Sequence, residues 1–395
     1  MNEVLYMWYL VLGLVMAVLL QSGSVQAQSN RVEANASLGG VYDSNRMLDP
    51  NADQPVSGLR EFASIQYRSL ESRKDWLVGV RATEEQLSDH QDQEGDSAEA
   101  FAKSSLSGER SSIQIDGKVK QDTTLATEFL AAGNISDEKA FLQGTLNLAA
   151  SANISETLRL NLGLNAENLD YQDSEKTSLD EYTYYGASTG AGLLVSELHS
   201  FELSVFASDL RNHTVESSNR TYGAKITWLA KLDQRFDIRA GLGGRKTYYE
   251  FEYPWLARAQ AQEGSGRVGD FKLNYQGARY SAQVNTSYEL VPNSNGYLVN
   301  RQAAGLVFSV RQSETMRVDV TGNYRQQRSE QTFQSRDDLD STIVALIFNW
   351  RFREHWHLAG RYQYFTRELV EIDEKADSQL VGLDLVWAMH PIWQD

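Results

Sequence analysis

The sequence predicts an all-β protein: a transmembrane antiparallel β-barrel of about eighteen strands that follows a cleaved signal peptide. Three observations support this fold class. The amino terminus looks like a secretory leader, the rest of the chain alternates apolar with polar residues, and the connections alternate between long and short. The composition agrees, because 19 Tyr, 14 Phe and 8 Trp accompany an apolar fraction of only 41% in a chain of 395 residues.

The amino terminus resembles a signal peptide. Leu5–Leu20 is an apolar run, and Val25-Gln26-Ala27 provides a small-x-small cleavage site, so we predict a signal peptide over 1–27 and an outer-membrane β-barrel over 28–395. The leader is unusual because it carries Glu3 and no Lys or Arg before the apolar run. An uncleaved anchor helix is the alternative, although the run is shorter than the ~20 residues that a membrane span needs.

Beyond the leader, the apolar residues recur at every second position. Leu158–Ala166 places Leu or Ala at alternate positions, with Arg159, Asn161, Gly163 and Asn165 between them. This period of two predicts strands with one apolar and one polar face, whereas helical spacing is not sustained. We expect strands near 31–43, 59–69, 75–85, 98–106, 111–121, 138–150, 157–169, 181–194, 199–211, 220–231, 235–250, 266–276, 279–290, 301–311, 316–328, 339–351, 356–367 and 379–389.

The connections between these segments alternate in length. Residues 44–58 and 86–97 form long connections, whereas residues 70–74 and 107–110 form short ones. Long outer loops opposite short periplasmic turns are typical of outer-membrane barrels with both termini on the periplasmic side. A soluble β-sandwich has no reason to alternate in this way.

Aromatic residues gather where the two membrane interfaces are expected. Rings with an apolar body and a polar edge favour these levels, which predicts a location in the bacterial outer membrane. Beside the predicted short turns lie Trp76, Trp228, Trp350 and Trp356. At the predicted outer rim lie Tyr248, Tyr249, Phe251, Tyr253 and Trp255, and also Tyr362, Tyr364 and Phe365.

The composition also excludes several classes of function. A net charge of −16 argues against a nucleic-acid partner, and the absence of Cys excludes disulfides, thiolate zinc sites and Cys nucleophiles. The sequence contains no HExxH or P-loop motif, no GxGxxG follows a predicted strand, and no base is placed to activate Ser44 beside Asp43. His355 and His357 could share a metal, but a solvated interfacial turn is favoured. We therefore expect no enzymatic activity, cofactor or metal.

The polar faces of the predicted strands would line a lumen. One interpretation is that neighbouring acids neutralise the basic residues and the wall merely hydrates the pore, and it is favoured because acids accompany the arginines. The other is a cationic path that draws an anionic solute or polymer through. The pore-lining candidates are Arg81, Lys118, Arg159, Arg235, Arg239, Arg279, Arg317, Arg325 and Arg361, with the acids Asp237 and Asp319.

The acidic excess falls largely in loops such as the one that contains Asp89, Asp92, Glu94 and Asp96. Clustered carboxylates can bind divalent cations, but a solvated loop is the favoured interpretation.

The first predicted strand ends in the segment GGVYDSNR, residues 39–46. Its Tyr42-Asp43-Ser44-Asn45 motif resembles the YDSN-type first hairpin of the outer-membrane β-barrel porins associated with bacterial exopolysaccharide gene clusters. The remainder of the chain is similar to that family in strand pattern and size. Asp and Ser side chains can cap the backbone of a turn, and we favour this structural role for the motif over a ligand site.

The resemblance implies export of an exopolysaccharide across the outer membrane, in partnership with a periplasmic polysaccharide-export apparatus and outer-membrane lipid. The strand number itself implies only a bore wide enough for water. Two alternatives remain open. One is a general diffusion porin for small solutes, a trimer with an inward-folded loop, which the short outer loops disfavour. The other is a structural or adhesive barrel with a closed lumen.

Overall fold

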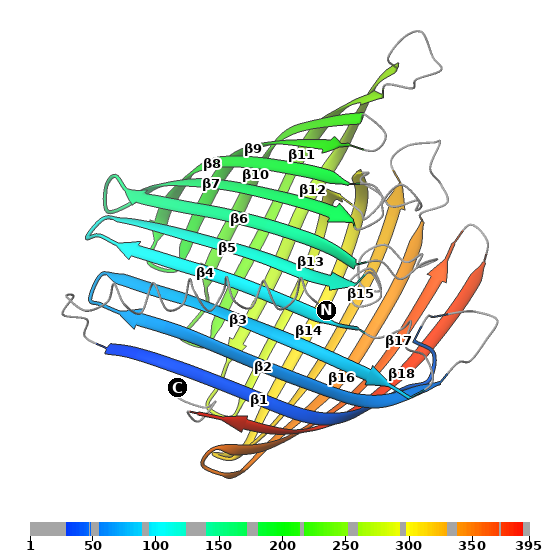
Figure 1. Ribbon diagram of the computed structural model, residues 1–395. Coiled ribbons are helices and arrows are strands. Elements are labelled where there is room, and N and C mark those ends of the chain that lie inside the picture. Colours follow the sequence, from blue (N-terminus) through cyan, green and yellow to red (C-terminus); the bar gives the residue numbers. More distant parts are fainter. Residues whose placement is uncertain are drawn as a thin grey trace.

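The computed structural model describes residues 29–46, 48, 55–88, 95–123, 140–171, 181–213, 217–251, 260–292, 298–329, 338–370 and 373–389. Within them the chain forms an 18-stranded antiparallel sheet that closes on itself as a barrel (Figure 1). β1 (Ser29–Asp43) pairs with β2 (Val56–Leu70) on one side and with β18 (Glu374–Ala388) on the other. The predicted fold class is therefore confirmed.

All other strands pair with their neighbours in chain order. Among the described residues no helix is long and apolar enough to cross a membrane. The remaining strands are β3 (Lys74–Leu87), β4 (Ser97–Ser107), β5 (Ser111–Thr123), β6 (Ala140–Asn153), β7 (Leu158–Tyr171), β8 (Tyr182–Ser196), β9 (His199–Asn212), β10 (Ser217–Lys231), β11 (Phe236–Phe251), β12 (Gln260–Gln276), β13 (Tyr280–Pro292), β14 (Leu298–Ser313), β15 (Met316–Ser329), β16 (Leu339–Arg353) and β17 (Trp356–Leu369).

The alternation of residues gives the barrel an apolar outer face. On β7 the side chains of Leu160, Leu162 and Leu164 are 44–45% exposed. The same face continues around the wall, where it includes Leu203, Val205, Ile226, Leu242, Leu306, Leu346 and Leu383. A soluble protein of this size would bury such a continuous apolar surface. It is the belt that contacts membrane hydrocarbon, and the protein lies in the bacterial outer membrane.

Each predicted strand is present, but several reach farther toward the long loops. β12 begins at Gln260 rather than at 266, and β18 begins at Glu374 rather than at 379. These extensions lie above the apolar belt and pair through the backbone, as Glu263 does with Tyr248. Because no lipid touches them, their sequences need not alternate, and the period of two could not reveal them.

Fewer of the predicted aromatic rings than expected face the membrane interfaces. Trp76, Trp350 and Trp356 are exposed beside the short turns, as expected. Tyr249 and Phe365, in contrast, are buried inside the barrel. The reason is that successive residues of a strand face opposite sides, so Tyr248 and Tyr249 cannot both face lipid. Tyr253, Trp255 and the predicted signal peptide lie outside the described residues.

The apolar belt can be tested on β7. Leu164→Arg places a charge on its lipid-facing side and should lower the free energy of unfolding by about 2–4 kcal/mol near the bilayer midplane. Asn161→Arg is the matched control on the opposite face of the strand, and should cost less than about 1 kcal/mol because lumen positions meet water. Urea titration in lipid vesicles measures both; equal losses would contradict this assignment of faces.

Candidate functional site: the lumen and its mouth

The inner face of the barrel carries an excess of cations, although the whole chain has a net charge of −16. Residues that pair across neighbouring strands share a face, so the registers assign the face that lies opposite the lipid belt. Its basic residues in the described strands are Arg31, Arg60, Arg68, Arg81, Lys103, Lys118, Lys120, Arg159, Lys225, Lys231, Arg239, Arg245, Lys272, Arg301, Arg311, Arg317, Arg325, Arg351, Arg361 and Arg367. Its acids are Glu33, Asp43, Asp75, Glu85, Glu99, Asp116, Asp122, Glu167, Glu202, Asp237, Asp270, Glu289, Asp319, Glu374 and Asp384.

Most of the pore-lining candidates lie on this inner face, and two do not. Arg235 and Arg279 each precede a strand by one residue and lie in short turns, because β11 and β13 begin later than predicted. The carboxylate of Asp233 accepts the backbone N–H of Arg235 at 2.6 Å, which ends the strand in a tight turn. The candidates on the inner face are Arg81, Lys118, Arg159, Arg239, Arg317, Arg325, Arg361, Asp237 and Asp319.

Several of these cations are held against the wall by acids. The carboxylate of Asp270 binds both Lys225 and Arg239, so one acid serves two basic residues. Such pairs neutralise charge and hold the side chains in place, but because they are in contact with water each contributes little to the stability of the fold. The lumenal pairs include Arg81–Glu99 at 2.9 Å, Lys225–Asp270 at 2.6 Å, Arg239–Asp270 at 3.0 Å, Arg301–Glu289 at 2.8 Å and Arg317–Asp319 at 2.8 Å.

Other lumenal cations have no such acid. Within the described part of the chain, Lys118, Arg325 and Arg361 form no ion pair. Arg325 experiences repulsion from Arg301, which exceeds the attraction of the more weakly acting Glu289. Arg361 experiences repulsion from Arg60, and Asp384 and Glu85 also act on it without forming an ion pair. A mobile anion relieves this repulsion, and these positions therefore favour anions over cations in the water that fills the lumen.

The β13–β14 hairpin leaves the wall near the mouth and leans into the lumen. β12 pairs with β11 along its whole length, but it pairs with β13 only from Gly269 to Gln276. Beyond that point Leu290 and Leu298, which the alternation assigns to the outer face, pack on residues of the inner wall instead. Those residues are Phe141, Leu169, Tyr171, Tyr182, Leu210 and Tyr249.

A polar contact fixes this hairpin to the inner face of the nearby strand β11. The guanidinium of Arg245 on β11 is 5% exposed, and its Nη2 donates to Asn300 Oδ1 of β14 at 2.5 Å. Its Nη1 donates to Thr247 Oγ1 at 3.0 Å, and the hydroxyls of Thr247 and Thr221 lie 3.0 Å apart. The hairpin end is thus held by apolar burial and by a charged hydrogen bond, and it narrows the mouth.

Leu48, which follows β1, also lies in the mouth. Leu48 is 1% exposed and packs against Phe365, Ala376 and Ile343, while Arg367 Nη2 donates to its carbonyl at 2.9 Å. The neighbouring Arg46 reaches Glu85 on β3 at 2.5 Å. The short outer loops therefore do not argue against a constricted mouth, because a few anchored residues and one leaning hairpin are enough to narrow it.

The YDSN motif lies at the seam of the barrel. Tyr42 faces outward, whereas the buried carboxylate of Asp43 accepts the hydroxyl of Ser378 and the backbone N–H of Asn45. Ser44 donates its N–H to the carbonyl of Gln379 at 3.0 Å and accepts the N–H of Gln379 on its hydroxyl at 2.9 Å. The motif thus caps the end of β1 and joins it to β18.

The histidines do not form a metal site in the described part of the chain, where no group of three His, Asp or Glu residues could hold an ion. His355 lies in the turn before β17, and its Nδ1 is 3.0 Å from the carbonyl of Ala388. His357 is buried on the inner face next to Arg351.

Comparison with known proteins gives only distant structural likenesses. No family model and no curated protein matches the sequence. OpdQ from Pseudomonas aeruginosa is 10% identical with a TM-score of 0.45, over 93% of this chain and 100% of that one. OccAB4 from Acinetobacter baumannii is 9% identical with a TM-score of 0.45, over 92% and 98%. The alcaligin outer-membrane receptor FauA from Bordetella pertussis is 9% identical with a TM-score of 0.41, over 90% and 75%.

Loosening the leaning hairpin should widen the mouth. The double variant Leu298→Ala/Asn300→Ala removes apolar burial and the acceptor of Arg245, so we expect a higher mean single-channel conductance with more frequent transitions between levels. Planar-bilayer recording measures both. Gln302→Ala, an exposed position on the same strand, should leave the trace unchanged. A double variant that conducts as the original chain does would show that the hairpin does not limit flow.

Proposed function

We propose that the protein is a passive outer-membrane channel for small hydrophilic solutes that prefers anions. The excess of cations on the inner face carries this proposal, above all Lys118, Arg325 and Arg361, which form no ion pair with an acid among the described residues. A wall charged in this way concentrates anions in the lumen and raises the barrier for cations.

The geometry of the mouth supports small solutes rather than unrestricted passage. Leu48 and the end of the β13–β14 hairpin both occupy space inside the rim. An 18-stranded barrel leaves an aqueous channel unless segments enter it, so these insertions set the size limit.

Ion selectivity tests the proposal directly. In a KCl gradient, the reversal potential should show preference for chloride, and Arg325→Gln/Arg361→Gln should lower the chloride-to-potassium permeability ratio by about twofold or more. Lys375→Gln is the control, because this side chain is 65% exposed on the outer face and pairs with Glu368. Cation preference in the original chain would contradict the proposal, and complete electrical silence would favour the structural or adhesive barrel.

Export of an acidic exopolysaccharide is the second candidate. The resemblance of Tyr42–Asn45 to the exopolysaccharide-associated porins favours it, and a cationic lumen suits a polyanion as well as a small anion. The capping role of Asp43 and Ser44 gives this motif a structural reason to be present that requires no contact with a polymer. A polymer would also need the β13–β14 hairpin to move away from Arg245.

Gene deletion separates the two candidates. If the channel exports a polymer through a periplasmic apparatus, deletion should abolish the polysaccharide in the culture medium, and the original gene should restore it. The Arg325→Gln/Arg361→Gln variant should restore less polymer than the Lys375→Gln control. If the amount of polymer is unchanged after deletion and the currents in bilayers are anion-selective, the small-solute channel is the candidate that remains.

A further inference from the structure

We propose that the outer face of β8–β10 is a binding site for an acylated lipid with an anionic headgroup, in which Arg211 and Arg220 hold the headgroup. The site lies on the lipid-facing side of the barrel, so it is separate from the lumen and does not depend on what the channel transports.

A groove on this face provides room for an acyl chain. It has a volume of about 690 Å³ and lies among outward-facing residues of β6–β10. Its outward-facing small residues are Ala166, Ala187 and Ala207, and its large apolar ones are Leu146, Leu148, Leu164, Tyr185 and Tyr222. Alanines beside leucine and tyrosine leave a hollow in the wall, and an apolar chain that fills such a hollow gains contacts that a flat wall does not offer.

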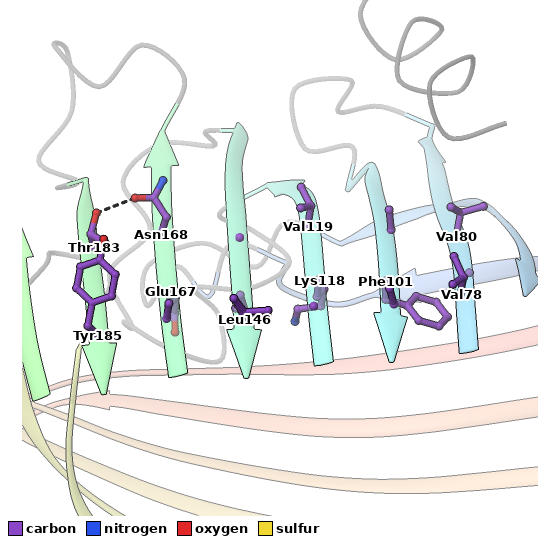
Figure 2. Close-up of a pocket in the computed structure, with 17 residues that line it drawn as sticks. Val78, Val80, Phe101, Lys118, Val119, Leu146, Glu167, Asn168, Thr183 and Tyr185 are labelled. Carbon is purple, nitrogen blue, oxygen red and sulfur yellow. Dashed lines mark hydrogen bonds between the residues drawn. The ribbon is translucent and has the colours of Figure 1, made fainter. Parts of the chain in front are cut away.

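A second groove of about 620 Å³ adjoins the first, and the two share Leu146, Ala166 and Tyr185. Figure 2 shows Tyr185 on the same strand as Thr183, whose hydroxyl donates to Asn168 Oδ1 at 2.8 Å. Leu146, Ala166 and Tyr185 thus lie between the two hollows, and Asn168 and Thr183 give the second hollow a polar edge. This arrangement fits a lipid with more than one acyl chain.

Two guanidiniums flank one carboxylate at the first groove: Asp209 and Arg220 line the groove, and Arg211 pairs with Asp209 beside them. Arg211 Nε donates to Asp209 Oδ2 at 2.9 Å, and Arg220 Nε lies 3.8 Å from Asp209 Oδ1. One carboxylate therefore orients two cations and leaves a net positive charge. Their side chains remain 58% and 62% exposed, so their remaining donors can bind a phosphate.

The cations stand at the level expected for a headgroup. Along the outer face of β9, Phe201, Leu203 and Val205 belong to the apolar belt, and Asp209 and Arg211 follow above Ala207 on the same face. Asp209 pairs across the ladders with Tyr185 on one side and Arg220 on the other. A lipid whose chains fill the groove would therefore present its headgroup to both guanidiniums. The alternative is that the two arginines simply extend their charged ends from the apolar belt into water, but that role would require no groove beneath them.

Lipid titration of the purified full-length chain tests the site. Native mass spectrometry should show tighter binding of phosphatidylglycerol than of phosphatidylcholine. Arg211→Gln/Arg220→Gln should lower the affinity for phosphatidylglycerol about tenfold or more and leave the affinity for phosphatidylcholine unchanged. Ala187→Leu/Ala207→Phe should fill the groove and weaken both lipids. Lys375→Gln is the control for loss of an outer-face cation away from the groove, and heat-dependent gel mobility verifies that each variant is folded.

Three outcomes would overturn the proposal: equal binding of the two phospholipids, unaltered phosphatidylglycerol binding by the arginine variant, or unaltered binding by the groove-filling variant. Glycerol phosphate, which carries the headgroup without chains, should not compete; competition at similar concentration would indicate a site for soluble anions and would also overturn the lipid site. The reversal potential of the arginine variant should equal that of the original chain, which separates this test from that of the channel.

Discussion

The structure depends on one constraint: in hydrocarbon, every backbone N–H and C=O must find its partner within the protein, because water is absent there. A sheet meets this condition only if it closes, so the junction of the first and last strands matters as much as any strand between them. Here nine residues of β1, from Asn35 to Asp43, pair with β18. Asp43 and Ser44 extend the junction with side-chain bonds to Ser378 and Gln379 at the rim.

Closure divides every strand into two environments. The outer face is apolar where it meets lipid, and its charged residues, such as Arg211 and Arg220, occur above the belt. The inner face can hold many cations because water screens them, and acids such as Asp270 and Glu99 hold some of them in place. The two signs of charge therefore occupy different places: the chain is acidic as a whole, yet more Lys and Arg than Asp and Glu face the lumen in the described strands.

The regular alternation fails where the barrel rises above the membrane. There β13 separates from β12, and leucines that would face lipid turn inward onto Tyr249 and its neighbours. The edge of β12 is tolerable at this level because water can satisfy its backbone. The same freedom lets Leu48 and the β13–β14 hairpin narrow the mouth without disturbing the wall that spans the bilayer.

The sequence by itself determined the strands, their number, their two faces and the membrane location, because each follows from a local period that the bilayer imposes on neighbouring residues. It also placed Arg325 and Arg361 on the inner face. Only the tertiary structure decided which cations have acid partners, why Tyr249 and Phe365 are internal, and how Arg245 meets Asn300. Those features join strands that are distant in sequence or residues above the membrane, where no period constrains the chain and packing alone selects the contacts.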